Sequence, residues 1–271
     1  MRLVARKSYI GEIPDTIQDF TEAFRKLPLA LNLAFQDILA RYRGSVIGPW
    51  WITVTSGALV LGIGINYGPL FGRPVSELLP YVAVGIVIWS FFASSISEGG
   101  EAFVAGGTML RQSALPLPLF IIRCVTRNLI NFGHQLVIIA AILLWFHIYP
   151  RIGSLWAVMG LIVLILNISW AALFLAIISA RFRDIPQIVS AGLQFIFFLS
   201  PIFWVPNDQM ARNPLVADNP FFFSVQSVRE PLLQGTMPHQ FFTILVPIAA
   251  VGWVATLLIY NQTRRRVVHY L

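Results

Sequence analysis

The positions of the charged residues constrain this chain more than any other feature of its sequence. All 19 lysine and arginine residues lie outside a set of long charge-free stretches. These stretches are 44–72, 78–97, 128–150, 152–180, 185–207 and 231–263. Each is at least as long as the ~20 residues that an α-helix needs to cross a hydrocarbon core of about 30 Å. Because a charge at mid-bilayer costs about 2.5–3.5 kcal/mol, the pattern predicts an all-α integral membrane protein with six transmembrane helices.

The distribution of the basic residues predicts the orientation of these spans, which we expect at about 50–70, 78–97, 128–149, 155–180, 185–204 and 241–260. Six crossings place both termini on one side. If that side is the cytoplasm, most of the basic residues lie inside, namely Arg2, Arg6, Lys7, Arg25, Lys26, Arg41, Arg43, Arg111, Arg123, Arg127, Arg181, Arg183, Arg264, Arg265 and Arg266. The outer segments then hold only Arg73, Arg151, Arg212 and Arg229. The positive-inside rule therefore predicts cytoplasmic N- and C-termini.

The composition agrees with a single membrane domain. Only 11% of the 271 residues are charged, whereas soluble domains carry about 25%. The net charge of +7 does not indicate a nucleic-acid partner, because the basic residues flank spans, where anionic lipid head groups account for them. The one cysteine, Cys124, excludes an internal disulfide and a cysteine metal cluster. The first 25 residues have no apolar core of a cleavable signal peptide, so we expect the first span to direct insertion.

The N-terminal segment has the pattern of an amphipathic helix. Apolar residues recur at steps of three or four from residue 17 onward, at Ile17, Phe20, Phe24, Leu27, Leu31, Phe35, Ile38 and Tyr42. The opposite face is polar and carries Asp19, Glu22, Arg25, Lys26, Asn32 and Gln36. Pro28 is expected to kink or divide the helix. We predict that residues 1–45 form a cytoplasmic segment whose helix lies along the membrane surface; the alternative is a helix packed on a soluble partner.

Two further segments break the simple pattern of spans. Residues 99–127 contain glycine pairs and a Leu-Pro-Leu-Pro sequence, which predict short helices joined by bends on the inner side. Residues 205–240 hold five prolines and yet the aromatic run 221–223. A pair of short helices that re-enter the membrane or lie in its interface explains both features. The transmembrane domain is then 46–263, followed by a cytoplasmic tail at 264–271.

Several kinds of chemistry are absent from the sequence. It has no Walker A, HExxH, GxSxG or CxxC motif, and its histidines, His134, His147, His239 and His269, are scattered. No carboxylate lies near the middle of a span, as proton coupling would require. We therefore expect a transport subunit, not an enzyme, that takes its energy from a partner. The alternatives are an intramembrane enzyme, which would need a nucleophile–base pair or a metal cluster in the spans, and a structural scaffold.

Aromatic residues make up 13% of the chain, and most are expected to face lipid or to pack between helices. A subset could stack on sugar rings inside a channel, because pyranose C–H faces pack on aromatic rings. The candidates are Trp89, Phe91, Phe92, Phe197, Phe198, Phe203, Trp204 and Phe222.

Five segments resemble a known family. Residues 36–50, QDILARYRGSVIGPW, resemble the sequence that leads into the first span of type-2 ABC exporter permeases for polysaccharides, which export O-antigen, capsule and teichoic acid chains. Further resemblances follow in order at 101–133, at the Arg-Phe-Arg-Asp turn 181–184, at SPIFW 200–204, and at 219–235. Together they cover about residues 30–262.

The resemblance implies a homodimer in the bacterial cytoplasmic membrane, bound to two separate ABC subunits that hold ATP and magnesium. No cofactor is expected in this chain. The implied substrate is an undecaprenyl-linked polysaccharide, which passes through a channel at the dimer interface. The motifs do not distinguish O-antigen from capsule or teichoic acid. The alternative is a type-2 ABC permease for a drug or a small lipid, which would share the topology.

Two groups of charged residues become site candidates. Residues expected to transmit motion from the ATPase lie at the inner ends of the spans, and are Glu98, Glu101, Arg111, Arg183 and Asp184. Asp37, Arg41 and Arg43, at the end of the N-terminal helix, are candidates for contact with the lipid pyrophosphate, since arginine binds phosphate through two hydrogen bonds. Anchoring at the inner membrane surface explains the same arginines equally well.

Overall fold

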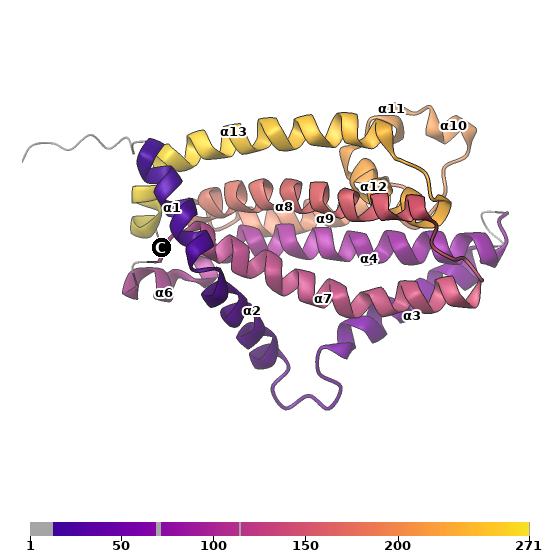
Figure 1. Ribbon diagram of the computed structural model, residues 1–271, viewed down its shortest axis with the longest axis horizontal. Helices are drawn as coiled ribbons and strands as arrows, with labels where there is room; N and C mark the ends of the chain where they lie inside the picture. Colours follow the sequence, from indigo (N-terminus) through magenta and orange to yellow (C-terminus); the bar gives the residue numbers. More distant parts are fainter. Residues whose placement is uncertain (1–12, 69–71, 114, 271) are drawn as a thin grey trace, which may run out of the picture.

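The computed structural model describes residues 13–68, 72–113 and 115–270, and these residues form helices and turns without a β-strand. Four helices are long and apolar enough to cross a membrane: α4 (Val75–Gly100), α7 (Pro118–Trp145), α8 (Trp156–Arg181) with the preceding 3-10 turn η1 (Ile152–Leu155), and α13 (His239–Tyr270). They run side by side along the long axis of the molecule (Figure 1). The chain is therefore built as a multi-pass helical bundle.

Two further apolar helices, expected as spans one and five, are shorter. α3 (Trp50–Tyr67) has 18 residues and α9 (Ile185–Leu199) has 15. α9 ends where Ser200 takes an extended conformation, with φ −89° and ψ 144°. The helical conformation is unfavourable for a residue that precedes a proline, so Pro201 ends this helix at Leu199. The span was expected to end at residue 204, five residues later.

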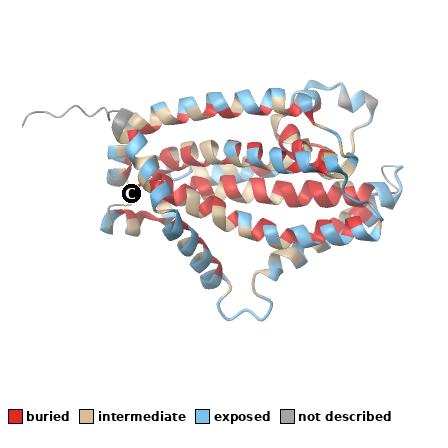
Figure 2. Cartoon of the chain, in the orientation of Figure 1, coloured by how far each residue is buried: buried red, intermediate tan, exposed pale blue. Residues whose placement is uncertain are grey.

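α4 is the central helix of the bundle. It contacts α3, α7, α8, α9 and α12, and 78% of the residues in its apolar stretch are buried, against 22% in that of α13. The sequence between residues 78 and 92 is apolar on nearly all sides, which is typical of a helix surrounded by other helices. Figure 2 shows this buried stretch along the middle of the molecule.

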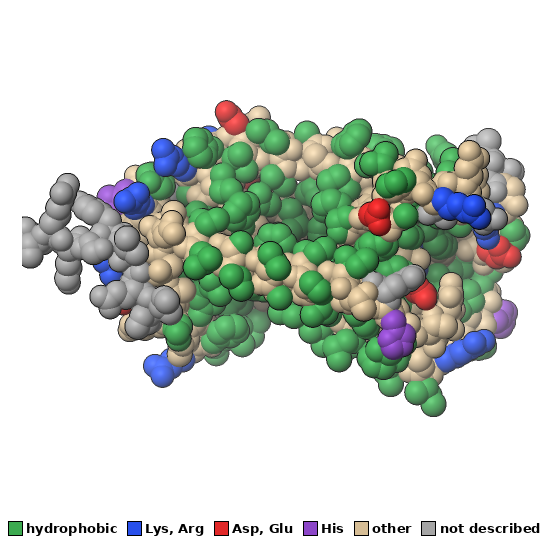
Figure 3. Space-filling view, turned by 90° about the horizontal axis from the view of Figure 1, so that it is seen from above, with side chains coloured by type: hydrophobic (Ala, Val, Ile, Leu, Met, Phe, Trp, Pro, Cys, Tyr) green, Lys and Arg blue, Asp and Glu red, His purple; other side chains and the backbone are tan. Residues whose placement is uncertain are grey.

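The outer surface of the bundle is apolar as well. Exposed valines, leucines and isoleucines lie along α3 and α13, among them Leu61, Ile65, Val251 and Leu258. In Figure 3, hydrophobic side chains cover the middle of the visible face and most of the charged ones gather toward its two ends. A water-soluble protein rarely exposes so large an apolar area, so this belt is suited to contact with lipid.

The N-terminal segment forms two helices, α1 (Ile13–Arg25) and α2 (Leu27–Arg41), which meet at Lys26. The division expected from Pro28 is confirmed, because this proline lies in the first turn of α2. Small residues such as Ala30 and Ala34 face the bundle. The expected apolar stripe is divided: Phe24 and Phe35 are more than half exposed and free for the membrane, whereas Ile38 is only 3% exposed and belongs to the contact with the bundle.

The expected inner segment of residues 99–127 differs in part from the prediction. It contains the short helices α5 (Ala102–Ala105) and α6 (Gly107–Gln112). However, α7 begins at Pro118 instead of residue 128, and proline is favoured in a first helical turn. The early start places Arg123 and Arg127 on a helix, where carboxylates of other helices pair with them. The expected tail at 264–271 is likewise helical to Tyr270, as the end of α13.

Residues 205–240 form three helices, not a pair, at the end of the bundle away from α1 (Figure 1). They are α10 (Asp208–Ala211), α11 (Pro214–Ala217) and α12 (Pro220–Gln234). Each begins after an asparagine whose side chain accepts a hydrogen bond from a backbone N–H of the first turn. α12 packs on α4, α8 and α13, which explains why this proline-rich segment needs aromatic residues.

Candidate functional site

A groove of about 550 Å³ lies between α3, α4 and α9, and six of the 13 residues that line it are polar or charged. We call it the α4–α9 groove. Its wall comprises Leu59, Ile86, Trp89, Ser90, Ala93, Ser94, Ser97, Glu98, Ser190, Leu193, Gln194, Phe197 and Phe198. A polar groove inside an otherwise apolar bundle is the strongest candidate for a site of function.

The polar residues of the groove follow the geometry of its two helices. Ser90, Ser94 and Ser97 lie about one turn apart on α4 and therefore on one face. Ser190 and Gln194 repeat this spacing on α9. Within the described residues, the structure gives no hydrogen bond to the side chains of these five residues. Their hydroxyl and amide groups are free to bind a polar ligand.

Aromatic rings lie beside these polar groups. The rings of Trp89 and Phe197 have centroids 6.0 Å apart, and Phe198 lies 5.4 Å from Phe197. Phe203 does not line the groove, but its ring stacks on that of Phe197 with the centroids 5.1 Å apart. The combination of rings with uncharged donors and acceptors suits a sugar, whose C–H faces are apolar and whose hydroxyls need partners.

The other expected channel aromatics lie elsewhere. Phe91 is buried against Phe132, with centroids 5.1 Å apart. Phe92 contacts the Trp89 ring, with centroids 5.4 Å apart, but it packs against Phe221 and does not line the groove. Trp204 donates a hydrogen bond to the Phe198 carbonyl oxygen at 3.3 Å. Phe222 contacts Phe223 and lies near a buried arginine on its own helix. The structure thus brings three of the eight candidates into the groove.

Glu98 links the groove to a network of charged residues. Its carboxylate accepts hydrogen bonds from Arg127 of α7 and Arg41 of α2, both at 2.8 Å, and from Asn128 at 2.9 Å. The Glu98 side chain is 26% exposed. The residue therefore contributes both to the wall of the groove and to the contact of α4 with α2 and α7.

Asp37 of α2 is the second carboxylate of this network. It accepts two hydrogen bonds from Arg123, one of them at 2.8 Å, and one from Arg127 at 2.8 Å. Arg127 bridges the two carboxylates, so that three arginines and two acids join α2, α4 and α7. We call Asp37, Arg41, Glu98, Arg123 and Arg127 the arginine–carboxylate network. Paired arginine–carboxylate geometry of this kind is directional and fixes the relative position of helices.

The network makes the stability of the protein depend on pH. Burial of Asp37 opposes its ionisation, but the hydrogen bonds from Arg123 and the charges of Arg123 and Arg127 outweigh burial, so its pKa lies below the ordinary value. A depressed carboxyl pKa stabilises the folded state above the unfolded pKa of about 3.9, and this stabilisation is lost as the pH falls from there through the folded pKa.

We therefore expect the difference in unfolding midpoint between the wild type and Asp37→Asn to be largest near neutral pH and to shrink below about pH 4. Thermal unfolding of both proteins from about pH 7 to about pH 3 checks this. A difference that stays constant over the range would show that ionised Asp37 does not stabilise the fold.

A second set of ion pairs joins α1 to the end of α13. Asp19 accepts hydrogen bonds from Arg264 at 2.6 Å and from the Tyr260 hydroxyl at 2.8 Å. Asp15 pairs with Arg264 and Arg265. The pKa of Asp15 is lowered, chiefly by the hydrogen bond from Arg265. Both α1 and α2 are thus bound to the bundle through their acidic residues.

Arg229 of α12 is buried at the other end of the bundle. It is 1% exposed and donates hydrogen bonds to the carbonyl oxygens of Pro201 at 2.9 Å and Ile202 at 3.0 Å. Its guanidinium lies 3.6 Å from the ring centroid of Tyr81. Gly85 makes this approach possible, because a Cβ there would lie 2.3 Å from the Ile202 carbonyl oxygen. Arg229 therefore holds α12 against α4 and against the turn that follows α9.

The remaining candidate residues lie on the surface. Glu101 and Arg111 are exposed beside α5 and on α6, at the end of the bundle where α1 lies (Figure 1). Arg183 donates to the Tyr270 carbonyl oxygen at 3.5 Å, and Asp184 is exposed directly before α9. Arg43 is exposed after α2. These residues do not join the groove.

Some important residues were not among the sequence candidates. The sequence could have indicated the serines of the groove, because residues 90, 94 and 97 repeat at helical spacing within one apolar span and therefore share one face of a helix. No sequence pattern indicated the roles of Arg123 and Arg127, because their partner Asp37 lies 86 and 90 residues away from them in the chain.

No group of three or more histidine, cysteine, aspartate or glutamate residues suited to a metal ion occurs in the described part of the chain.

Known proteins resemble the chain over most of its length. Residues 30–233 match the profile of the family described as ABC-2 type transporter. An O-antigen export system permease protein RfbA of Klebsiella pneumoniae is 23% identical over 248 residues, which cover 88% of this chain and 93% of that protein. The protein of the same name from Myxococcus xanthus is 24% identical over 243 residues, which cover 88% and 91%. The similarity therefore extends over almost the whole bundle.

Proposed function

The chain belongs to the ABC-2 type transporter family, and we propose that it is the membrane-spanning permease subunit of an exporter that moves a lipid-linked polysaccharide out of the bacterial cytoplasm. The relatives are named as O-antigen export permeases, which supports a polysaccharide as the substrate. The observation that carries the proposal is the α4–α9 groove, where unpaired hydroxyls and aromatic rings lie together. Rings beside hydroxyl groups suit a sugar, which has apolar C–H faces and hydroxyls that need partners.

The proposed topology has six spans with both termini in the cytoplasm. α3 covers about 27 Å at 1.5 Å per residue, close to the hydrocarbon thickness of about 30 Å. α9 covers about 22 Å, and residues 200–204 complete its crossing. α10, α11 and α12 then form the short re-entrant helices on the outer side. The excess of basic residues at the end with α1 and α6 supports this orientation.

The proposed exporter contains two copies of this chain and two ATPase subunits that bind ATP and magnesium. The groove is open beside α3 and α9, whose apolar side chains such as Leu61 and Phe195 are exposed. A second copy would close it into a channel. Glu101, Arg111, Arg183 and Asp184 are the proposed contacts of the ATPase.

The arginine–carboxylate network has a proposed role at the inner mouth of the groove. Glu98 belongs to both the groove and the network, so that a movement of α2 would be transmitted to the channel wall. Arg41, whose side chain is 44% exposed, and Arg43 are the proposed contacts of the lipid pyrophosphate. A permease for a drug or a small lipid would share the topology, but it would not need the row of serine hydroxyls.

The proposal predicts that narrowing the groove stops export. Ser94→Phe places a ring between α4 and α9 and is expected to reduce the surface polysaccharide of the bacterium by about tenfold or more, because the path is blocked sterically. Ser94→Ala keeps the width and is expected to export nearly normally. The measurement is immunoblotting of surface glycan in a strain that lacks the chromosomal gene.

Ser169→Phe is the matched control, because Ser169 lines a different, apolar cavity between α1, α7 and α8. A strain with Ser169→Phe should export as much polysaccharide as the wild type. Co-purification of the tagged chain with an ATPase and a lipid-linked glycan tests the assembly. Normal surface glycan in the deletion strain, or a chain that purifies without an ATPase, would overturn the proposed function.

A further inference from the structure

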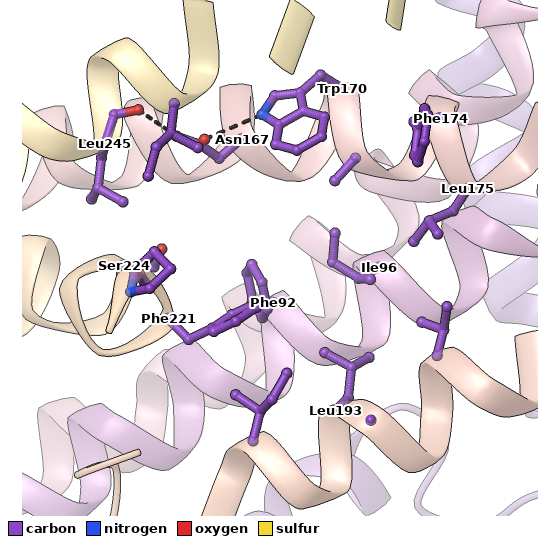
Figure 4. A pocket seen from close by; sticks show the side chains of 16 residues that line it. Phe92, Ile96, Asn167, Trp170, Phe174, Leu175, Leu193, Phe221, Ser224 and Leu245 are labelled. Carbon is purple, nitrogen blue, oxygen red and sulfur yellow. Dashed lines mark hydrogen bonds between the residues drawn. The ribbon is translucent and has the colours of Figure 1, made fainter. Parts of the chain in front are cut away.

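A second large cavity lies on the other side of α9 from the groove. It has a volume of about 460 Å³ and is lined by residues of α4, α8, α9, α12 and α13. Figure 4 shows Asn167, Trp170 and Phe174 of α8 facing Phe92, Ile96 and Leu193 across an open space. We call it the lateral cavity. Its lining is almost entirely apolar, in contrast to that of the groove.

The few polar groups of the lateral cavity already have partners within the protein. The Asn167 amide donates to the carbonyl oxygens of Val163 at 2.9 Å and Leu245 at 3.2 Å. Its oxygen accepts the Trp170 indole N–H at 3.2 Å, as the dashed lines in Figure 4 show. The Ser224 hydroxyl donates to the Pro220 carbonyl oxygen. A ligand in this cavity therefore meets hydrocarbon, whereas a ligand in the groove meets unpaired hydroxyls.

α9 is the wall between the two spaces. Ser190, Gln194 and Phe197 face the groove, whereas Val189, Gly192 and Ile196 face the lateral cavity. Leu193 lines both. On α4 the division continues, because Trp89 lines the groove and Phe92 lines the cavity. One helix thus separates a surface suited to sugars from a surface suited to a hydrocarbon chain.

The lateral cavity can be reached from the membrane. α9 and α13 form two of its sides, but α9 packs mainly on α4 and α8, and α13 packs mainly on α8 and α12. Exposed apolar residues lie on both helices, such as Phe195 and Val251. A chain from the lipid layer can therefore enter between α9 and α13 without crossing a polar region.

On the premise of the proposed function, we infer that the lateral cavity holds a segment of the polyprenyl chain of the carrier lipid while the glycan occupies the groove. The substrate joins an apolar chain to a polar one, and the two spaces beside α9 match these two parts. The phosphate that links them would pass the start of α9, where Arg181 and Arg183 are exposed next to Asp184. An apolar cavity, whose few polar groups are hydrogen-bonded within the protein, would then lie beside a polar groove because the substrate itself has an apolar and a polar part.

Gly192 allows the cavity to be filled without disturbing the fold. A Cβ at this position meets no atom within 4 Å, and replacing a helical glycine favours the helix. Gly192→Phe therefore places a ring in the cavity. Gly133 of α7 is the matched control, because its Cβ also meets nothing within 4 Å but it lines neither space.

The test uses the purified exporter complex in lipid nanodiscs with two photoactivatable probes. One is a polyprenyl phosphate that carries a diazirine in its chain, and the other is a phosphatidylglycerol with a diazirine in an acyl chain. We expect the polyprenyl probe to label residues of α8, α9 and α13 around the cavity in the wild type. Gly192→Phe should reduce this labelling by about tenfold, and Gly133→Phe should not.

Labelling of the cavity by phosphatidylglycerol that excess polyprenyl phosphate does not displace would overturn the inference, since the cavity would then hold a bilayer lipid. Polyprenyl labelling at other sites in the wild type would also overturn it, whatever the behaviour of the variant. Surface glycan separates this failure from that of the proposed function. Normal export by Gly192→Phe together with labelling elsewhere rejects the lateral cavity alone, whereas export without any copy of the gene rejects the exporter.

Discussion

Replacing Arg229 with methionine is expected to lower the free energy of unfolding by about 2–4 kcal/mol. The substitution leaves the buried Ile202 carbonyl oxygen without its donor, at about 1–3 kcal/mol for an unsatisfied group. It also removes one of the two donors of the Pro201 carbonyl oxygen, which still accepts from the Tyr81 hydroxyl at 2.9 Å. It also removes the contact with the Tyr81 ring at 3.6 Å. Methionine is uncharged, so the substitution also removes the free-energy cost of burying a cation, which offsets part of the lost stability. Thermal unfolding of the purified protein measures the result.

Two further variants separate the geometry of Arg229 from its charge. Lysine keeps the charge but offers one point of contact instead of a planar fork, so Arg229→Lys should recover only part of the stability. Arg212 is exposed between α10 and α11, and Arg212→Met is the matched control that should leave the unfolding midpoint unchanged. A wild-type midpoint for Arg229→Met would mean that α12 is held by its apolar contacts alone.

Reversing the charge of Asp37 is expected to release α2 from the bundle. The Asp37 side chain is 19% exposed and binds Arg123 and Arg127. An arginine at this position would leave Glu98 as the only carboxylate among four arginines. Breaking buried ion pairs costs about 3–5 kcal/mol, and because these pairs are partly exposed we expect a loss of about 3 kcal/mol for Asp37→Arg.

The release of α2 can be measured with a cysteine at Ala34, which is fully buried on the face toward the bundle. In an otherwise native chain, Ala34→Cys should react slowly with a water-soluble thiol reagent, and it should react much faster when Asp37→Arg is present. The native Cys124 is buried and contributes little background. Equal rates in both proteins would show that α2 stays bound without the network.

The exposed pair of Lys26 and Glu22 offers the control for this experiment. The side chains of the two residues are 37% and 43% exposed, and exposed pairs contribute about 0–1 kcal/mol. Glu22→Arg should therefore leave the labelling of the cysteine unchanged. Exchanging the charges with Asp37→Arg and Arg123→Asp together should restore part of the slow reaction, since the two side chains can pair again in the opposite sense.

The aromatic residues show how much of the site could be predicted from the sequence. Eight were expected to line a channel, and the structure places Trp89, Phe197 and Phe198 in the groove. Phe91 and Phe92 are neighbours of Trp89 in the sequence, but they point into the core and into the lateral cavity. Composition and helical spacing assign a residue to a helix; the neighbouring helices decide which face meets a groove.

The sequence by itself determined that this is a membrane protein, that apolar helices occupy its charge-free stretches, and that an amphipathic segment precedes them. These features depend on the free energy of moving a local stretch from water into lipid, and this free energy is a property of the stretch alone. Only the tertiary structure decided that Arg229, expected in an outer segment, is buried, that Asp37 and Glu98 share Arg127, and that α9 separates two unlike spaces. These features depend on contacts between segments far apart in the chain, and no local pattern of residues encodes such contacts.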